Sequence, residues 1–156
     1  YSPALLRTES TGLQTGNVPF ALASERGAPG RMGGLMVHEI RCWFIKRNAT
    51  LMQKLLEFGY GREDCQVINY WDDNAPLSVS DEQCKWLLLE RNGKLMVLLC
   101  TWNENEAQLT VNADTDALGV KVNKAVNAEN DDSMNAANGR FRFTMPGYGT
   151  RIFRME

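Results

Sequence analysis

Residues 85–100, with the sequence KWLLLERNGKLMVLLC, carry the clearest structural signal in the chain. Two mostly apolar runs flank the dipeptide Asn92-Gly93. Asn-Gly readily supplies the two positive φ angles of a type I′ turn, so the stretch predicts a tight β-hairpin. A two-residue turn fixes the register of the two strands, and the register predicted here places Leu87 opposite Leu98.

This hairpin has two apolar faces, because side chains alternate along a strand. The two faces are Leu87, Leu89, Met96 and Leu98 on one side, and Trp86, Leu88, Val97 and Leu99 on the other. Burying a side chain of this size contributes about 1.5–3 kcal/mol, so an uncovered face would cost several times that amount. A two-sheet sandwich covers only one face. We therefore expect the other to be covered by residues 1–62, or by the domain from which they came.

After Cys65 the sequence consists of short β-branched and aromatic runs separated by Asn, Asp and Gly, the pattern of an all-β fold. We expect strands near residues 66–71, 84–91, 94–102, 107–112, 119–128, 140–145 and 149–155. Seven strands without intervening helices favour antiparallel packing. The predicted fold class is mainly β: an antiparallel β-sandwich over residues 65–156, preceded by an irregular segment with one buried strand and one helix.

The first third of the chain has a different pattern. Residues 1–31 contain scattered Gly and Pro without a period, which predicts irregular loop. The apolar run 35–40 predicts a short buried strand. Asn48 can cap a helix that continues to about Phe58, with Gly59 as its terminating residue.

Length and charge exclude several classes of protein. A chain of 156 residues is too short for a complete (β/α)8 barrel, and no apolar run approaches the roughly 20 residues of a membrane-spanning helix. The net charge of −2 excludes the basic balance that nucleic acid binding demands. We thus expect neither a membrane nor a nucleic acid partner. Since the chain lacks an initial Met, we expect a processed product or an excised part of a longer protein.

The charge also divides the chain. Residues 1–62 carry a net charge of +4 and residues 63–156 a net charge of −6. This change predicts a domain boundary near residues 60–65, although a solvated acidic face explains the second value equally well.

The four cysteines are far apart in the sequence, and the chain has a single histidine. No metal site is therefore expected. The hairpin register places Cys84 and Cys100 on opposite faces of adjacent strands, so we predict four buried free thiols. The glycine-rich residues 27–34 match neither phosphate-binding motif, and we predict no cofactor.

Two short segments carry groups that could do chemistry. His38-Glu39 would place a general acid or base at the end of a buried strand, where barrel enzymes keep such groups. The alternative is structural: a hydrogen-bonded histidine, and a glutamate paired with Arg41 or Arg31.

Residues 69–74, NYWDDN, place two aromatic rings beside two carboxylates at a strand end. Aromatic rings stack on the apolar faces of sugars, so Trp71 and Asp72 are candidates for carbohydrate contact. The alternative is that Tyr70 and Trp71 are core or interface residues and that Asp72-Asp73-Asn74 is a turn.

The order of these elements resembles a known arrangement. It comprises Tyr70-Trp71, then Trp86-Leu87-Leu88-Leu89, Leu118-Gly119-Val120, a strand reaching Ala128-Glu129, Gly139-Arg140-Phe141 and a last pair around Pro146. Residues 65–156 thus resemble the C-terminal β-sandwich that follows the (β/α)8 barrel in α-galactosidase-like glycoside hydrolases. Residues 31–39 and the helix after them look like the last strand and helix of such a barrel, so residues 1–62 are read as a remnant of that domain.

The resemblance implies a secreted, carbohydrate-active parent protein, extracellular or periplasmic, in which the sandwich stabilises the preceding barrel and does no chemistry. Glycoside hydrolysis needs two carboxylates, and no matching pair can be assigned in this chain. Glu39 is the best catalytic candidate, with His38 and Arg41 as residues that could position substrate. We do not expect the chain to be active alone.

Two other functions fit the sequence. One is a free-standing carbohydrate-binding module that uses exposed Trp71, Trp43 or Trp102 as a stacking platform. The other is a structural or interaction domain without sugar chemistry. A row of solvent-facing aromatic rings would favour the binding module, whereas buried tryptophans would favour a scaffold.

Overall fold

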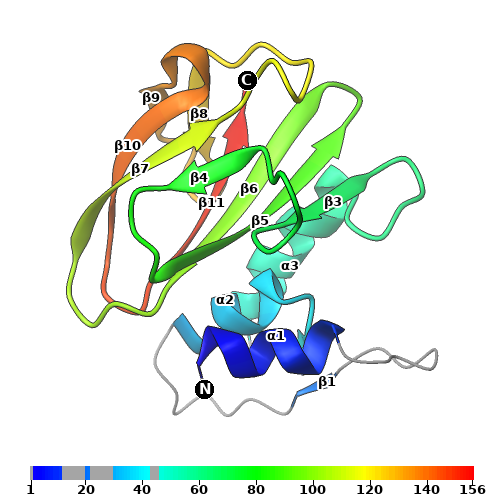
Figure 1. Cartoon of the computed structure of the whole chain (residues 1–156), viewed down its shortest axis with the longest axis vertical. Coiled ribbons are helices and arrows are strands. Elements are labelled where there is room, and N and C mark those ends of the chain that lie inside the picture. Colours follow the sequence, from blue (N-terminus) through cyan, green and yellow to red (C-terminus); the bar gives the residue numbers. More distant parts are fainter. Residues whose placement is uncertain (1, 12–19, 22–29, 43–45) are drawn as a thin grey trace.

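A computed structural model describes residues 2–11, 20–21, 30–42 and 46–156. Up to Phe58, the described residues form three helices and one two-residue parallel strand pair: α1 (Pro3–Thr11), β1 (Phe20–Ala21), α2 (Gly30–Val37), β2 (Arg41–Cys42) and α3 (Lys46–Phe58). Figure 1 shows α1 and α2 beneath the sheets and α3 beside them. None of the described helices is both long and apolar enough to span a membrane.

The rest of the chain forms two antiparallel sheets that face each other. The larger has the strand order β3-β5-β6-β11-β8-β9, and the smaller the order β10-β7-β4. Their bounds are β3 (Gln66–Asn69), β4 (Leu77–Val79), β5 (Cys84–Arg91), β6 (Lys94–Thr101), β7 (Ala107–Ala113), β8 (Lys124–Asn127), β9 (Ser133–Asn135), β10 (Arg140–Met145) and β11 (Thr150–Met155). A short 3-10 helix, η1 (Ala137–Gly139), precedes β10. The predicted mainly β, antiparallel sandwich is confirmed.

The hairpin at the centre of the larger sheet has the predicted register. Leu87 pairs with Leu98, and the pairing runs without a bulge from Cys84 opposite Thr101 to Arg91 opposite Lys94. The turn residues have the positive φ angles that a type I′ turn requires, 53° for Asn92 and 73° for Gly93. A side chain at the second position would be strained, which explains the glycine.

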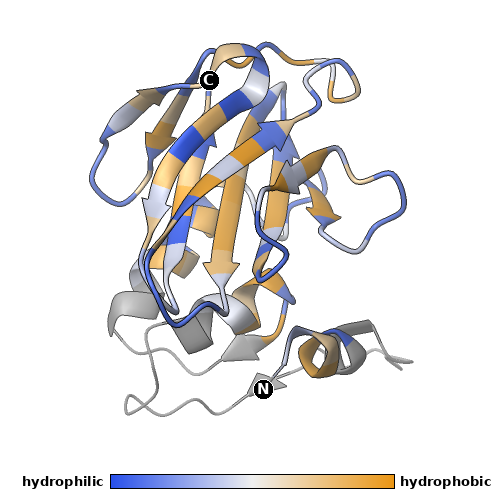
Figure 2. Ribbon diagram, turned by 60° about the vertical axis from the view of Figure 1, so that its left-hand side comes forward, coloured by the Kyte–Doolittle hydropathy of each residue, from blue (hydrophilic) through white to orange (hydrophobic). Residues whose placement is uncertain are grey.

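The two faces of this hairpin enter two separate cores. Trp86, Leu88, Val97 and Leu99 pack with Leu109, Val111, Phe141, Phe143 and Phe153 between the two sheets. Leu87, Leu89, Met96 and Leu98 pack with Met36, Val37, Leu51 and Leu55 of α2 and α3. Figure 2 shows hydrophobic residues along the strands and hydrophilic residues mainly in the loops. The fold therefore has three layers, and the predicted cover over the second face is confirmed.

The prediction of a buried strand at residues 35–40 is wrong. Residues 30–37 form α2, and a turn follows at residues 38–39. A short apolar run is compatible with either a buried strand or a buried helix, so its length and hydropathy could not decide. The helix packs closely because Gly33 and Gly34 have no side chain: a Cβ at Gly33 would overlap Thr150, and one at Gly34 would lie 3.0 Å from Trp102.

The predicted helix α3 is present, but it begins at Lys46, so Asn48 lies inside it and is not its cap. Leu51 and Leu55 are buried, as their spacing indicates. The helix ends before Gly59, which has a φ of 135° and whose amide donates to the carbonyl of Leu55.

Strand boundaries differ from the sequence prediction where polar residues interrupt the pattern. Residues 119–128 contain strand only at β8; Gly119, with a φ of 64°, ends a turn, and residues 120–123 between it and β8 are not strand. The short strands β4 and β9 were not predicted. The prediction of irregular loop over residues 1–31 is wrong at residues 3–11, which form the helix α1. Cys65, Cys84 and Cys100 are buried thiols, with Cys84 and Cys100 in different cores as expected; the side chain of Cys42 lies outside the described residues.

Candidate functional site

His38 lies in the turn after α2, and its side chain is completely buried. Nδ1 donates a hydrogen bond of 2.7 Å to the carbonyl oxygen of Gly34. This bond fixes the tautomer, so Nε2 accepts from the hydroxyl of Tyr70 at 2.9 Å. Burial lowers the pKa of His38 below its usual value and keeps the ring neutral. Both ring nitrogens are therefore used within the protein.

Three aromatic rings enclose this imidazole. Trp71 stacks on it with ring centroids 5.5 Å apart and an interplanar angle of 24°. Tyr70 and Trp102 meet it edge to face at 5.5 and 5.9 Å. The arrangement holds Tyr70 and Trp71 against the turn after α2. The hydrogen-bonded His38 and the partly buried Tyr70 and Trp71 agree with the structural alternatives for these three residues, whereas the side chains of Arg31 and Arg41 lie outside the described residues.

Glu39 is the second residue of the turn and has a φ of 57°. Its Oε2 accepts from the hydroxyl of Tyr60 at 3.2 Å, and its Oε1 accepts from the side-chain amide of Asn69 at 3.0 Å. Glu39 is partly buried, and its carboxylate accepts hydrogen bonds from two other parts of the chain. It thus links α2, the end of α3 and β3.

The other sequence candidates are distributed differently. Trp71 is partly buried, and the guanidinium of Arg7 lies 5.9 Å from its ring. Asp72 is exposed and accepts from the backbone amide of Asn69 at 2.7 Å, as a turn residue does. Arg41 begins β2, but its side chain lies outside the described residues. A catalytic role for Glu39 and substrate contacts for His38, Arg41, Trp71 and Asp72 stay predictions.

The exposure of the tryptophans bears on the binding-module alternative. Trp86 is buried, Trp71 and Trp102 are partly buried, and Trp43 lies outside the described residues. Among the described aromatic residues, Tyr148 is the exposed one, at 36%. A coplanar row of solvent-facing rings is therefore not present in this part of the chain.

The sequence analysis named both partners of the His38–Tyr70 and Glu39–Asn69 contacts, but only Glu39 of its contact with Tyr60. It singled out His38, Glu39 and residues 69–74, but it did not connect them. Tyr60 gave no signal because it simply follows the glycine that ends α3. The connection depends on the fold, which brings the turn after α2 next to the end of β3.

A cavity of about 720 Å³ lies beside this cluster. It is bounded by the start of α1 on one side, and by Tyr70, the residues just before β5 and Lys85 of β5 on the other. Neither His38 nor Glu39 lines it, and Glu82 is the one carboxylate among the described residues that do. A pair of carboxylates suited to glycoside hydrolysis is thus not assembled there. In the described ranges, no group of three or more His, Cys, Asp or Glu residues could hold a metal ion.

Residues 49–138 match the family described as glycoside hydrolase 123, C-terminal domain. This range covers α3 from its fourth residue and the sandwich as far as η1. No curated protein matches the chain.

Solved structures with a similar fold are also glycoside hydrolases. A GH30 endoxylanase from Clostridium papyrosolvens C71 has a TM-score of 0.62 at 10% identity, over 89% of this chain and 41% of that one. A GH27 β-L-arabinopyranosidase from Geobacillus stearothermophilus has a TM-score of 0.55 at 10% identity, over 86% and 32%. The chain spans less than half of either protein. At this identity the likeness concerns the fold, and with the family match it confirms the predicted resemblance to a glycoside hydrolase C-terminal region.

Proposed function

This chain belongs to the family of glycoside hydrolase 123 C-terminal domains and is the C-terminal part of a glycoside-hydrolase-like protein; from that premise we propose that it stabilises a preceding catalytic domain and does no chemistry itself. In this proposal the preceding domain is a (β/α)8 barrel. Residues 1–62 belong to the end of that domain, and residues 65–156 form the sandwich that packs on it. The parent protein acts on carbohydrate outside the cytoplasm, in the extracellular space or periplasm.

The observation that carries the proposal is the apolar seam between the helices and the larger sheet. Leu51 and Leu55 of α3 and Val37 of α2 are at most 4% exposed, and they meet Leu87 and Leu98. Each such side chain contributes about 1.5–3 kcal/mol when fully buried. Because the helices and the sheet share this buried interface, a folded sandwich stabilises the domain to which the helices belong.

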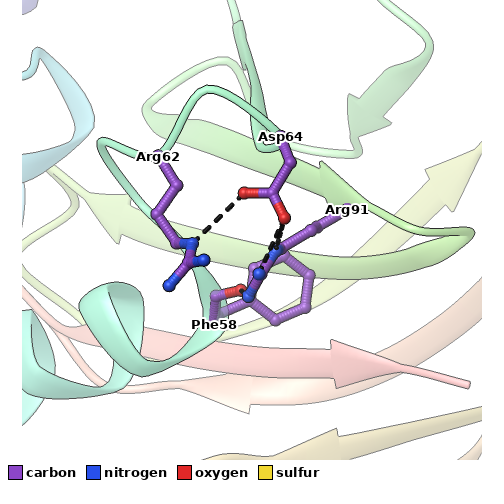
Figure 3. A network of polar contacts seen from close by, with 4 residues as sticks. All are labelled: Phe58, Arg62, Asp64 and Arg91. Atoms are coloured by element: carbon purple, nitrogen blue, oxygen red, sulfur yellow. Dashed lines mark hydrogen bonds and ion pairs between the residues drawn. The ribbon is translucent and has the colours of Figure 1, made fainter.

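A polar clamp fastens the end of α3 to the end of β5 (Figure 3). Arg91 donates from Nη1 to the carbonyl of Phe58 at 3.0 Å, and from Nε and Nη2 to the carboxylate of Asp64 at 2.9 and 2.7 Å. Arg62 donates to the other oxygen of Asp64 at 3.2 Å. These contacts lower the pKa of Asp64. The clamp closes the junction between the helical segment and the sandwich at the predicted boundary near residues 60–65.

The local chemistry of His38 and Glu39 supports a structural role. The imidazole is neutral and uses both nitrogens on Gly34 and Tyr70, while the carboxylate accepts from Tyr60 and Asn69. A general acid or base must reach the substrate proton that it transfers. These groups instead connect the helices to β3, as a scaffold requires.

Leu55 and Leu56 offer a matched test of the proposal in the full-length parent protein. Leu55 is 1% exposed and lies in the seam, whereas its neighbour Leu56 is 54% exposed. Truncating a buried leucine to alanine costs about 2–5 kcal/mol. If the sandwich stabilises the catalytic domain, Leu55→Ala should lower the temperature at which the parent loses glycosidase activity, and Leu56→Ala should not.

The assay follows the hydrolysis of a panel of nitrophenyl glycosides after incubation at rising temperature, together with spectroscopic unfolding. The proposal requires kcat of the Leu55→Ala parent to be unchanged at low temperature. It fails if this variant unfolds the sandwich while glycosidase activity keeps its original thermal resistance. It also fails if kcat falls without any change in stability. Cell fractionation of the source organism tests the location.

A further inference from the structure

Asn92-Gly93 forms the turn of the central hairpin, and it is also a chemically reactive pair of residues. The side-chain amide of an asparagine can be attacked by the backbone nitrogen of the next residue. A glycine in that next position has no side chain to hinder the attack. The chain contains this dipeptide twice, at Asn92-Gly93 and at Asn138-Gly139. Both asparagines are exposed and have a φ of 53°, so the two sites differ only in what surrounds them.

The turn at Asn92-Gly93 is open to solvent. Both residues are exposed at one end of the larger sheet (Figure 1). A Cβ at Gly93 would meet no described atom within 4 Å beyond its two chain neighbours, so the space beside this residue is free. In the part of the chain that the structure describes, the Asn92 side chain has no hydrogen bond that would hold it in one position. Its amide carbon can therefore rotate towards the backbone nitrogen of Gly93.

Glu90 places a base at this nitrogen. Its Oε1 accepts a hydrogen bond from the Gly93 amide at 2.9 Å. A general base must lie about 2.6–3.2 Å from the atom whose proton it takes, and this contact meets that requirement. The N–H bond lies in the peptide plane, whereas the nitrogen attacks through the face of that plane. The hydrogen bond to Glu90 thus leaves the attacking face of the nitrogen uncovered.

The second dipeptide has neither feature. Gly139 is buried, and its amide donates to the carbonyls of Ala136 at 3.0 Å and Val122 at 3.4 Å. A Cβ at Gly139 would lie 2.6 Å from the carbonyl oxygen of Ala113, so the backbone is closely packed here. The nitrogen that would attack Asn138 is therefore held in place by the fold, and its proton faces carbonyl oxygens instead of a carboxylate.

We propose that Asn92 is a site of spontaneous deamidation and that Glu90 is its general base. The Gly93 nitrogen forms a bond to Cγ of Asn92 while Glu90 takes the amide proton. Glu90 then returns a proton to the side-chain nitrogen, the bond from Cγ to this nitrogen breaks, and ammonia leaves. A five-membered succinimide remains, and one water molecule opens it to aspartate or isoaspartate. Water is the one co-reactant in this sequence.

Either product alters the turn that sets the hairpin register. Aspartate adds a negative charge at position 92, and isoaspartate also adds one carbon to the backbone of a two-residue turn. A longer turn no longer matches the pairing of Arg91 with Lys94, from which the rest of the register follows. We therefore expect the isoaspartate form to melt at a lower temperature. The reaction does not depend on the stabilising role proposed above, so either proposal can fail alone.

Incubation of the 156-residue chain in mildly alkaline buffer tests the proposal. Peptide mapping by mass spectrometry follows the mass gain at each asparagine, and chromatography separates aspartate from isoaspartate. In the folded chain, Asn92 should react about tenfold faster than Asn138 or more. In the urea-unfolded chain the two should react at similar rates, because both are then followed by an equally accessible glycine.

Glu90→Gln tests the role of the base. Glutamine still offers an oxygen to the Gly93 amide but cannot take its proton, so Asn92 should react about tenfold more slowly in the folded variant. In unfolded Glu90→Gln the rate should be unchanged. Glu82→Gln is the matched control, because Glu82 is exposed and precedes the opposite end of β5. Asn138 in the same molecules is an internal reference, since partial unfolding would accelerate both asparagines.

Three results would overturn the proposal. The first is reaction of Asn138 as fast as Asn92 in the folded chain, which would mean that the surroundings of the two glycines do not matter. The second is an Asn92 that stays intact in the folded chain after the unfolded chain has reacted completely, because the turn would then protect it. The third is an unchanged rate in folded Glu90→Gln, since the carboxylate would then take no part in the reaction.

Discussion

Leu87 and Leu88 are neighbours on β5 whose side chains enter different layers, so truncating each one tests a different interface. Leu87 is 1% exposed and packs against the helices, whereas Leu88 is 0% exposed and packs between the two sheets. If the larger sheet is covered on both sides, Leu87→Ala and Leu88→Ala should destabilise the chain to a similar degree. A sheet with one open face would tolerate one of the two changes.

The expected size follows from burial. Removing a fully buried leucine side chain to the Cβ costs about 2–5 kcal/mol, which includes the lost transfer free energy and the cavity left behind. In a domain of this length each kcal/mol lowers the melting temperature by about 2–4 °C. A central value of about 3 kcal/mol therefore predicts a fall of roughly 6–12 °C for either variant.

Thermal and urea unfolding, followed by circular dichroism, provide the measurement. Leu56→Ala on the exposed side of α3 is the control and should stay within about 0.5 kcal/mol of the parent chain. Leu87→Asp and Leu88→Asp should be more severe, because each buries an unpaired charge. A loss below about 1 kcal/mol for Leu87→Ala, with a full loss for Leu88→Ala, would refute the three-layer arrangement.

Three further predictions concern the contacts between the layers. Gly33→Ala should cost about 1–3 kcal/mol in urea unfolding, because a Cβ there overlaps Thr150; a neutral result would mean that α2 packs less closely. Arg91→Gln should lower the melting temperature more than Arg62→Gln, since only Arg91 also binds the Phe58 carbonyl; equal effects would contradict a clamp on α3. The pKa of His38 is lowered by burial, so the unfolded chain takes up a proton near pH 6.5 that the folded chain resists. The free energy of unfolding should therefore fall as the pH drops from about 7.5 to 5.5, by at most about 1.4 kcal/mol per pH unit. His38→Gln should remove this pH dependence of the free energy of unfolding, because the chain has one histidine. An unchanged slope would mean that a group other than His38 causes it.

The sequence was most informative where local chemistry determines geometry. Asn92-Gly93 specifies its own turn type. The turn then fixes every cross-strand pair between β5 and β6, from Arg91 opposite Lys94 to Cys84 opposite Thr101. The apolar residues on both sides of the hairpin also predicted that a third layer must exist. Both conclusions needed only rules that act within a few residues.

Elements that depend on tertiary contacts were harder to predict. The run 35–40 has no period that distinguishes a buried helix from a buried strand. Residues 35–37 end the helix α2, which Gly33 allows to pack closely against Thr150. The short strands β4 and β9 exist because longer strands pair with them. In the candidate site, His38 and Tyr70 are 32 residues apart, and no sequence pattern joins them.

Native-state hydrogen exchange tests most directly whether the helices and the sandwich form one structure. The amides in the middle of α3 and those in β5 and β6 are the probes. If α3 is an integral cover of the sheet, both sets should exchange only through global unfolding, with the same free energy. Exchange of the α3 amides through a local opening several kcal/mol below the global value, while the sheet stays protected, would show that α3 is not an integral layer of the fold.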